Sequence, residues 1–307
     1  MPKLAQTELQ VSDICFGGNV FGWTADQEQS FKLLDRFIEL GGNFIDTADV
    51  YSAWKEGNKG GESETIIGNY TKAKGNRDSL VIATKVAMLE SRKGLSAKNI
   101  VAACDDSLRR LQTDHIDIYY AHSDDLETPL EETLEGFNSL VVAGKVRYIA
   151  ASNYTYERLS EALKISAENN FAKYIALQNR YSLVAREPYE SDGAKSVSDF
   201  GISGLPYSTL GSGFLSGKYQ EGQSVDSMRA QGVTNNYANS ENFALLKRLT
   251  QVAEKLNVSN TALALAWLRM QQGVTVPLAS GRTIEQLEAL MQKVELSSED
   301  ADFIAGK

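Results

Sequence analysis

The sequence contains little of what several protein classes require. None of its apolar runs approaches the about 20 residues of a membrane-spanning helix, so no membrane segment is expected. The first ten residues lack the apolar stretch of a secretory signal, and only two cysteines occur in 307 residues, which favours a reducing cytoplasm. Lysine and arginine number 31 against 40 acidic residues, for a net charge of −9. An acidic chain without a basic stripe argues against nucleic acid and anionic membranes as partners.

Metal-ligating side chains are equally scarce. Cys15 and Cys104 fall in apolar surroundings without a CxxC motif, so both are expected to be buried free thiols. The two histidines, His115 and His122, form no cluster with them, so the sequence predicts no metal. His115 precedes the expected fourth strand and is interpreted as structural.

The chain does have a regular alternation of short β-type runs and longer amphipathic runs, which is the pattern of a parallel sheet covered by helices. Strands are expected at 14–16, 43–46, 80–84, 116–120, 146–150, 175–178, 202–207 and 274–277. Ser96 and Thr128-Pro129 are typical helix starts, and Gly41-Gly42 is a typical stop. No composition break divides the chain, so the sequence predicts one (β/α)8 TIM barrel as a single domain over 1–307. Periodicity alone leaves a doubly wound sheet as an alternative.

One segment departs from this alternation. Residues 211–240 follow the expected seventh strand and are rich in glycine, serine and asparagine. Loops of this length are usually functional or disordered. The segment is therefore predicted to be an extended loop over the barrel mouth.

Polar residues follow the apolar runs in series. In a barrel of this kind the reactive groups lie at the carboxyl ends of the strands. The second run ends in Asp46, with Tyr51 on its loop, the third in Lys85 and the fourth in His122. The remaining runs end in Ser152-Asn153, Gln178-Asn179, Tyr207-Ser208 and Ser280-Gly281-Arg282, and the first ends in Gly17-Gly18-Asn19. Packing alone would not require such a series on one face, so this face is the predicted site.

The residue types at these ends suggest proton transfer to an oxygen. Asp46 and Lys85 end adjacent strands and can pair, which places an ammonium near the Tyr51 phenol. A free tyrosine has a pKa of about 10, and a nearby cation is expected to lower it. Such a general acid typically contributes about 10²–10⁴ in rate. His122 can hydrogen-bond and orient a substrate oxygen.

These residues lie in stretches that resemble the aldo-keto reductase superfamily. The matching stretches are NFIDTADVY with GESETIIG, VIATK, SLRRLQTDHIDIYYAH, GKVRYIAASN, YIALQNRYSL, and LPYSTLGSGFLSGKY with VPLASGRTIEQLEAL. They run in the family's order from about residue 14 to 290. The resemblance implies that Asp46, Tyr51, Lys85 and His122 form the family's catalytic tetrad, with Tyr51 as the proton donor.

The resemblance also implies a nicotinamide dinucleotide held without a Rossmann fold, and the chain has no GxGxxG motif. Ser152, Asn153 and Gln178 would hold the carboxamide, and Tyr207 would stack on the ring. Arg282 would meet a 2′-phosphate, which favours NADPH over NADH. The implied cofactor-binding set also contains Gly18, Asn19, Val20, Asp46, Ser208, Leu210, Gly211, Gly213, Lys218, Ser280, Gly281 and Gln286.

The expected substrate is a small-molecule aldehyde or ketone, and Trp23 and Trp54 on the first two loops are predicted to line its pocket with Tyr51 and His122. Leu290 and Ser123-Asp124-Asp125 depart from the family's usual residues near the adenine and the substrate. Two other functions stay open at this point. One is a nucleotide-sensing regulatory module of the same superfamily, and the other is a sugar or polyol dehydrogenase working in the oxidative direction. Oligomeric state is also open.

Overall fold

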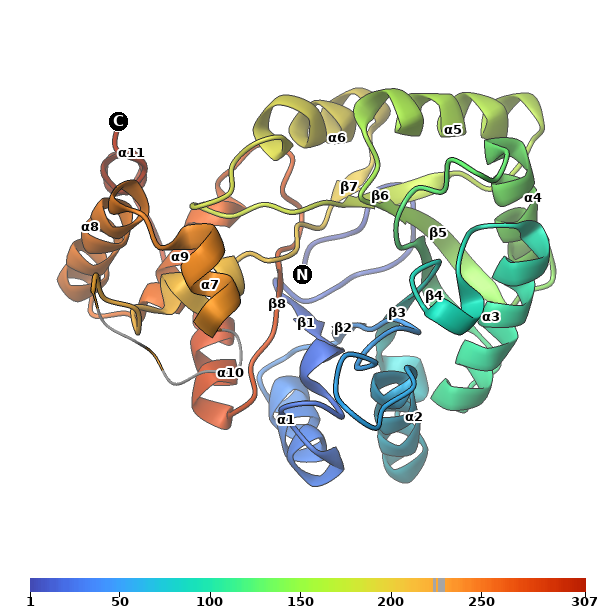
Figure 1. Ribbon diagram of the computed structural model, residues 1–307, viewed down its shortest axis with the longest axis horizontal. Helices are drawn as coiled ribbons and strands as arrows, with labels where there is room; N and C mark the ends of the chain where they lie inside the picture. Colours follow the sequence, from blue (N-terminus) through green and yellow to red (C-terminus); the bar gives the residue numbers. More distant parts are fainter. Residues whose placement is uncertain (223–224, 226–229) are drawn as a thin grey trace.

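Eight parallel strands form the central sheet of the computed structural model, which describes residues 1–222, 225 and 230–307. The strands are β1 (Cys15–Gly17), β2 (Phe44–Asp46), β3 (Val81–Val86), β4 (Ile116–Ala121), β5 (Val146–Ser152), β6 (Tyr174–Gln178), β7 (Ser203–Gly204) and β8 (Leu278–Ala279). Their order is β7-β6-β5-β4-β3-β2-β1-β8, and the sheet curls around a central axis (Figure 1). Its two ends meet where the Leu278 N–H donates to the Pro206 carbonyl at 2.8 Å. This sequential order confirms the TIM barrel and excludes the doubly wound alternative.

The helices surround this sheet. They are α1 (Gln27–Glu39), α2 (Glu62–Lys74), α3 (Ala97–Leu111), α4 (Leu130–Val142), α5 (Tyr156–Glu168), α6 (Ala194–Phe200), α7 (Ala230–Tyr237), α8 (Ser240–Leu256), α9 (Asn260–Arg269), α10 (Ile284–Met291) and α11 (Ser298–Ala305). Ser96 caps α3 by accepting the Asn99 N–H, as its sequence predicts. Helices α7, α8, α9 and α11 lie together on one side of the barrel (Figure 1). No helix in the described ranges is both long and apolar enough to cross a bilayer.

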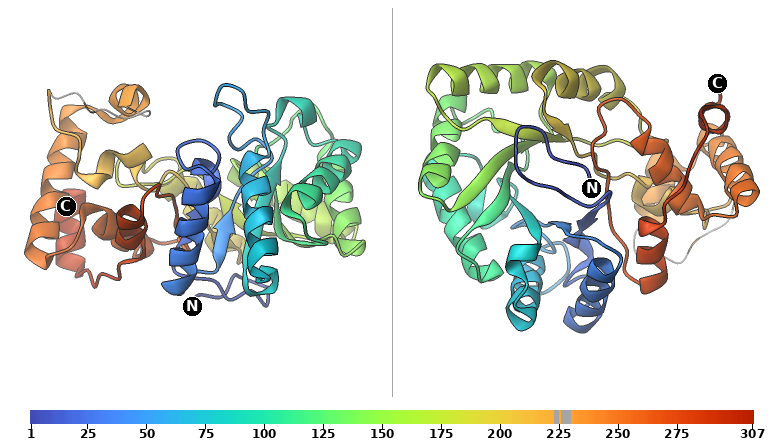
Figure 2. Two further views of the ribbon diagram at one scale, coloured as in Figure 1. Left: turned by 90° about the horizontal axis from the view of Figure 1, so that it is seen from below. Right: turned by 180° about the vertical axis from the view of Figure 1, so that it is seen from behind.

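The barrel interior is filled from its amino-terminal end. The segment before β1 folds back through an antiparallel bridge between Lys3 and Gln10 and lies across the barrel (Figure 2). Its Leu4, Leu9 and Val11 are buried with strand residues such as Phe44. A second cluster of buried residues packs the sheet against the helices. Because apolar side chains close this end, a ligand can reach polar strand ends only from the carboxyl-terminal face.

The predicted seventh and eighth strands differ from the observed ones. Residues 202–207 give only a two-residue β7, because Pro206 has no N–H for a ladder. Residues 274–277 lie just before β8, and Pro277 interrupts pairing there in the same way. The predicted loop at 211–240 contains a short 3₁₀ helix, η5 (Gly211–Ser216), and α7. Residues 223, 224 and 226–229 of that predicted loop lie outside the described residues.

Candidate active site

A buried ion pair joins the ends of β2 and β3. Asp46 and Lys85 are both fully buried, and the Lys85 Nζ lies 2.5 Å from the Asp46 Oδ2. The ammonium also donates to the Thr47 carbonyl at 2.8 Å. The other carboxylate oxygen, Oδ1, accepts the Gln178 Nε2 at 3.0 Å. A carboxylate can therefore end a buried strand here, because both of its oxygens have partners.

The Tyr51 phenol completes this arrangement from the loop after β2. Its oxygen accepts from the Lys85 Nζ at 3.1 Å, and its hydroxyl lies 3.5 Å from the Asp46 Oδ2. The ammonium is also 4.8 Å from the centre of the phenol ring. The structure thus brings together the three residues that the strand ends predict.

The pKa of Tyr51 differs from the lowered value that the sequence predicts. The nearby cation does act to lower it, but burial raises the pKa more strongly and Asp46 adds to that effect. The net result is a pKa raised to about 12, whereas the sequence argument expects a lowered one. Tyr51 is therefore a neutral phenol, carrying its proton, throughout the physiological range.

His122 lies beside this phenol at the end of β4. Its ring centre is 6.0 Å from that of Tyr51, and its backbone N–H donates to the Val86 carbonyl at 2.9 Å. Burial, and then the charge of Lys85, hold the pKa of His122 well below its usual value. In the described part of the chain the Nδ1 atom has no hydrogen-bond partner. A neutral imidazole can thus offer one N–H to a substrate oxygen.

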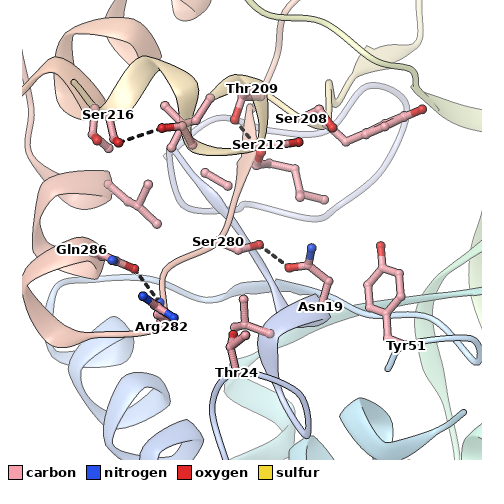
Figure 3. A pocket seen from close by; sticks show the side chains of 18 of the residues that line it. Asn19, Thr24, Tyr51, Ser208, Thr209, Ser212, Ser216, Ser280, Arg282 and Gln286 are labelled. Atoms are coloured by element: carbon pink, nitrogen blue, oxygen red, sulfur yellow. Dashed lines mark hydrogen bonds between the residues drawn. The ribbon is translucent and has the colours of Figure 1, made fainter. Parts of the chain in front are cut away.

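Tyr51 and the neighbouring His122 line a cavity of about 610 Å³, and Figure 3 shows Tyr51 within it. Tyr51 lies at one end of the view, Arg282 and Gln286 lie at the other, and the Ser280–Asn19 hydrogen bond lies between them. The predicted residues that line the cavity are Asn19, Val20, Trp23, Tyr51, His122, Ser152, Asn153, Gln178, Tyr207, Ser208, Leu210, Gly213, Lys218, Ser280, Arg282 and Gln286. The predicted residues Gly18, Asp46, Trp54, Lys85, Gly211 and Gly281 do not line it.

Three of the predicted residues outside the lining, Lys85, Asp46 and Trp54, still contact residues that form the wall. Lys85 and Asp46 both contact the Tyr51 hydroxyl, as described above. The Trp54 ring is 5.7 Å from the ring of Tyr51 and 5.7 Å from that of Trp23. Trp54 is about half exposed, so it extends the aromatic wall outward from the cavity.

Hydrogen bonds connect the amide-bearing residues next to the phenol. The Ser152 hydroxyl donates to the Gln178 carbonyl at 2.7 Å, and the Asn153 Nδ2 donates to the His122 carbonyl at 2.9 Å. The Tyr207 hydroxyl donates to the Asn153 Oδ1 at 2.8 Å. These four residues, from β5, β6 and the loops after β5 and β7, lie beside the carboxylate–lysine–phenol cluster, which Gln178 contacts directly.

The far end of the cavity carries a guanidinium. Arg282 is exposed just before α10, and its backbone N–H donates to the Gln286 Oε1 at 2.9 Å. Its guanidinium makes no ion pair within the described residues. Serine hydroxyls line the path between the two ends, and Gly213 takes a φ of 98° there, a conformation that favours glycine. The cavity therefore combines a charged end, a row of hydrogen-bonding groups and an end that carries the Tyr51 phenol and the His122 imidazole.

Sequence reasoning missed several lining residues. These are Thr24, Met88, Thr209, Ser212, Ser216, Thr261, Leu278, Ala279, Glu285 and Ala289. Ser212 and Ser216 lie within the GSGFLSGKY stretch, so its small hydroxyl residues are a usable signal. The left-handed backbone of Ser208 and Ser212, each at a φ of 55°, has no comparable signal in the sequence.

A second buried carboxyl, Asp49, lies on the loop that carries Tyr51. It is fully buried, and within the described structure neither of its oxygens has a hydrogen-bond partner. The neighbouring Glu64, by contrast, accepts from the Thr84 hydroxyl and the Arg110 Nε, each at 2.6 Å. Burial, reinforced by Glu64 and opposed by Arg110, raises the pKa of Asp49 to about 8. Asp49 is therefore mostly protonated at neutral pH.

Asp49→Asn is expected to stabilise the protein at alkaline pH. The folded protein holds the Asp49 proton up to about pH 8, whereas the unfolded chain releases it near pH 4, so stability falls across that window. Asparagine has no such proton, so the variant should be at least about 2 kcal/mol more stable at pH 9 and closer to the wild type at pH 5. Urea unfolding at both pH values measures the difference. Asp78→Asn, at an exposed position, is the control, and an equal gain at both pH values would contradict the assignment.

Comparisons with known proteins agree with this geometry. A model of the aldo/keto reductase family matches residues 13–307. The chain is 32% identical to an uncharacterized oxidoreductase, YrpG, of Bacillus subtilis, over 96% of this chain and 90% of that protein. It is 32% identical to the norsolorinic acid reductase stcV of Emericella nidulans, over 95% and 77% of the two chains. It is 30% identical to an aryl-alcohol dehydrogenase [NADP(+)] of Phanerodontia chrysosporium, over 94% and 80%.

Proposed function

The chain belongs to the aldo/keto reductase family, and from this premise we propose that it is an NADPH-dependent oxidoreductase that reduces an aldehyde or ketone to an alcohol. The observation that carries the proposal is the contact of Lys85 with the Tyr51 phenol at one end of a cavity whose other end holds Arg282. Tyr51 acts as the general acid. We place the reaction in the cytoplasm, which the scarcity of cysteines favours.

The cavity residues fit an extended dinucleotide phosphate. Ser152, Asn153 and Gln178 offer hydroxyl and amide groups to a carboxamide, and the Tyr207 ring offers a flat surface to a nicotinamide. Arg282 suits a phosphate because a guanidinium presents paired donors. Between these ends, Ser208, Leu210 and Gly213 with Asn19 and Ser280 would lie along the pyrophosphate. When bound, the reduced nicotinamide supplies the hydride.

The chain's own residues handle the proton. His122, which is neutral, donates a hydrogen bond that orients the carbonyl oxygen. Tyr51 transfers its hydroxyl proton to that oxygen as negative charge develops on it, because an alkoxide is a stronger base than a phenolate. The Lys85 ammonium, already 3.1 Å from the phenol oxygen, stabilises the phenolate that remains.

Asp46 keeps that ammonium charged. Burial disfavours a charged lysine, but Asp46 and Tyr51 outweigh it, and the pKa of Lys85 is raised above its usual value. The same burial keeps Tyr51 protonated, which is the form that reduction requires. Oxidation of an alcohol requires the phenolate instead, so with a pKa of about 12 the rate of oxidation should be low at neutral pH and rise with pH.

The site also supports an aromatic carbonyl compound as substrate. Trp23, Trp54 and Tyr51 form a chain of edge-to-face rings beside His122, and Met88 adds an apolar lining group. The name of one relative refers to aryl alcohols, in keeping with this wall. That name also describes a dehydrogenase, so oxidation of an aromatic alcohol at high pH is the second candidate.

Activity assays with purified protein test these proposals. The expected result is NADPH consumption with aromatic and aliphatic aldehydes at neutral pH, and NADP⁺ reduction by aryl alcohols that rises with pH. Ketones, quinones and sugars extend the panel. Tight NADPH binding without turnover on any compound in either direction would instead indicate a nucleotide-sensing module and overturn the enzymatic proposal.

Arg282→Gln is expected to weaken NADPH binding by about tenfold while leaving NADH binding unchanged. An exposed guanidinium–phosphate contact of about 1.5 kcal/mol corresponds to that factor. The dissociation constants of both cofactors can be measured from the quenching of tryptophan fluorescence. Arg36→Gln, which removes a guanidinium paired with Glu39 and Glu288 on the surface, is the matched control. An equal loss for NADH and NADPH would place the 2′-phosphate elsewhere.

A further inference from the structure

A second cavity adjoins the main one at the carboxyl-terminal face of the barrel. It has a volume of about 420 Å³ and lies between the ends of β6 and β7 and helix α7. Tyr207, Ser208 and Ser212 line both cavities, so the two spaces share one wall. The remaining polar groups of the second cavity come from Arg180, Asn236 and Tyr237.

The chemistry of this cavity suits an anion. Arg180 is its single charged lining residue among those described, and no described lining residue carries a carboxylate. The guanidinium carbon lies over the Tyr237 ring, 5.3 Å from its centre, and the group donates to the Tyr237 hydroxyl at 2.5 Å. Arginine has five N–H donors, and this contact orients the group while using few of them. No carboxylate pairs with Arg180 in the described structure, so its positive charge stays available to an anion in the cavity.

The position of Arg180 links it to the reacting end of the main cavity. Arg180 continues β6 through a parallel bridge with Tyr207, two residues beyond Gln178. Gln178 lines the main cavity and Arg180 lines the second, so the end of β6 borders both. Gln178 contacts Asp46 directly, and the Tyr207 hydroxyl reaches the His122 carbonyl through Asn153. The two cavities share Tyr207, Ser208 and Ser212, so a molecule that extends from the main cavity into the second would place a carbonyl at Tyr51 and a second polar group near Arg180.

We propose that Arg180 is a specificity-determining residue that binds an anionic group, a carboxylate or a phosphate, carried by the carbonyl substrate. This inference rests on the proposed function, because it assigns a substrate class to the same site. Ser212 and Asn236 also line this cavity and offer it a hydroxyl and an amide. Tyr237 holds the guanidinium in place, which reduces the freedom that binding must remove.

Paired substrates test the proposal. The wild type and the Arg180→Gln variant are assayed with 4-carboxybenzaldehyde against its methyl ester, and with glyceraldehyde 3-phosphate against glyceraldehyde. We expect kcat/KM for the acidic member of at least one pair to fall by about tenfold to a hundredfold in the variant, through KM, with less than a twofold change for its neutral partner. Arg180→Lys should recover part of the loss. Arg109→Gln, which removes one exposed positive charge on α3, is the control for net charge.

Two binding measurements separate this proposal from its alternatives. The dissociation constant of NADPH should not change in Arg180→Gln, and a weaker cofactor would assign the guanidinium to the pyrophosphate and overturn the proposal. Equal losses for acidic and neutral aldehydes would indicate a purely structural arginine. Calorimetric binding of benzoate to the NADPH-saturated protein requires no turnover. Loss of benzoate binding in the variant would therefore support the anion site even if no aldehyde is reduced, and unchanged or absent binding would overturn it.

Discussion

Tyr51→Phe is expected to lower kcat by about 10²–10⁴ while leaving the NADPH dissociation constant unchanged. The phenol is the proposed proton donor, and general acids of this kind contribute about 10²–10⁴ in rate. Loss of the hydroxyl also leaves the buried Lys85 ammonium without one of its three acceptors, but Asp46 and the Thr47 carbonyl remain. The ring that lines the cavity is retained, so cofactor binding should persist. Steady-state kinetics and fluorescence titration measure the two quantities.

A second tyrosine provides the control for this substitution. The Tyr156 hydroxyl donates to Asp199 at 3.1 Å on the outside of the barrel, so Tyr156→Phe removes the same atom without touching the cavity. That variant should keep wild-type kcat. Normal turnover in Tyr51→Phe would contradict the mechanism, whereas loss of NADPH binding along with turnover would mean that the phenol serves the cofactor.

The proton affinity of Tyr51 gives this prediction a pH dependence. The group must be protonated for reduction, and its pKa is raised to about 12. The rate of reduction should therefore stay level from neutral pH to about pH 11 and fall only through about pH 12, if the protein remains folded. The rate of alcohol oxidation should rise over the same range. If the Lys85 ammonium alone set the pKa of Tyr51, that pKa would be lowered. The fall in the reduction rate and the rise in the oxidation rate would then lie closer to neutral pH.

The site was visible in the sequence because of strand geometry. The carboxyl ends of parallel strands meet on one face, so Asp46, Lys85 and His122 could be placed together without coordinates. The pKa of Tyr51 could not be predicted from the sequence, because it depends on how far burial outweighs the charge of Lys85. In the sequence, Asp49 looks like an ordinary loop aspartate. Only the folded structure shows that its carboxyl is buried without hydrogen-bond partners among the described residues. The second cavity depends on where α7 lies against β6 and β7, which no local pattern encodes.

Lys85→Met is expected to abolish turnover and to destabilise the fold by about 3–5 kcal/mol. Removing one partner of a buried ion pair leaves the other charge without compensation, and Asp46 would keep only the Gln178 amide and a distant phenol as partners. Urea unfolding measures the loss of free energy of unfolding. Lys145→Met removes an ammonium that pairs with Asp105 at the surface and should cost less than about 1 kcal/mol. A comparably small loss for Lys85→Met would mean that the buried pair contributes little to the fold.

The double variant Asp46→Asn with Lys85→Met separates stability from chemistry. It removes both charges, so no uncompensated ion stays buried, and asparagine can still accept the Gln178 amide proton. Most of the stability lost in Lys85→Met should therefore return, to within about 1–2 kcal/mol of the wild type. The kcat should not return, because no cation remains to stabilise a Tyr51 phenolate. If the double variant recovers turnover along with stability, the ammonium acts only by holding the fold, and Tyr51 donates its proton without it.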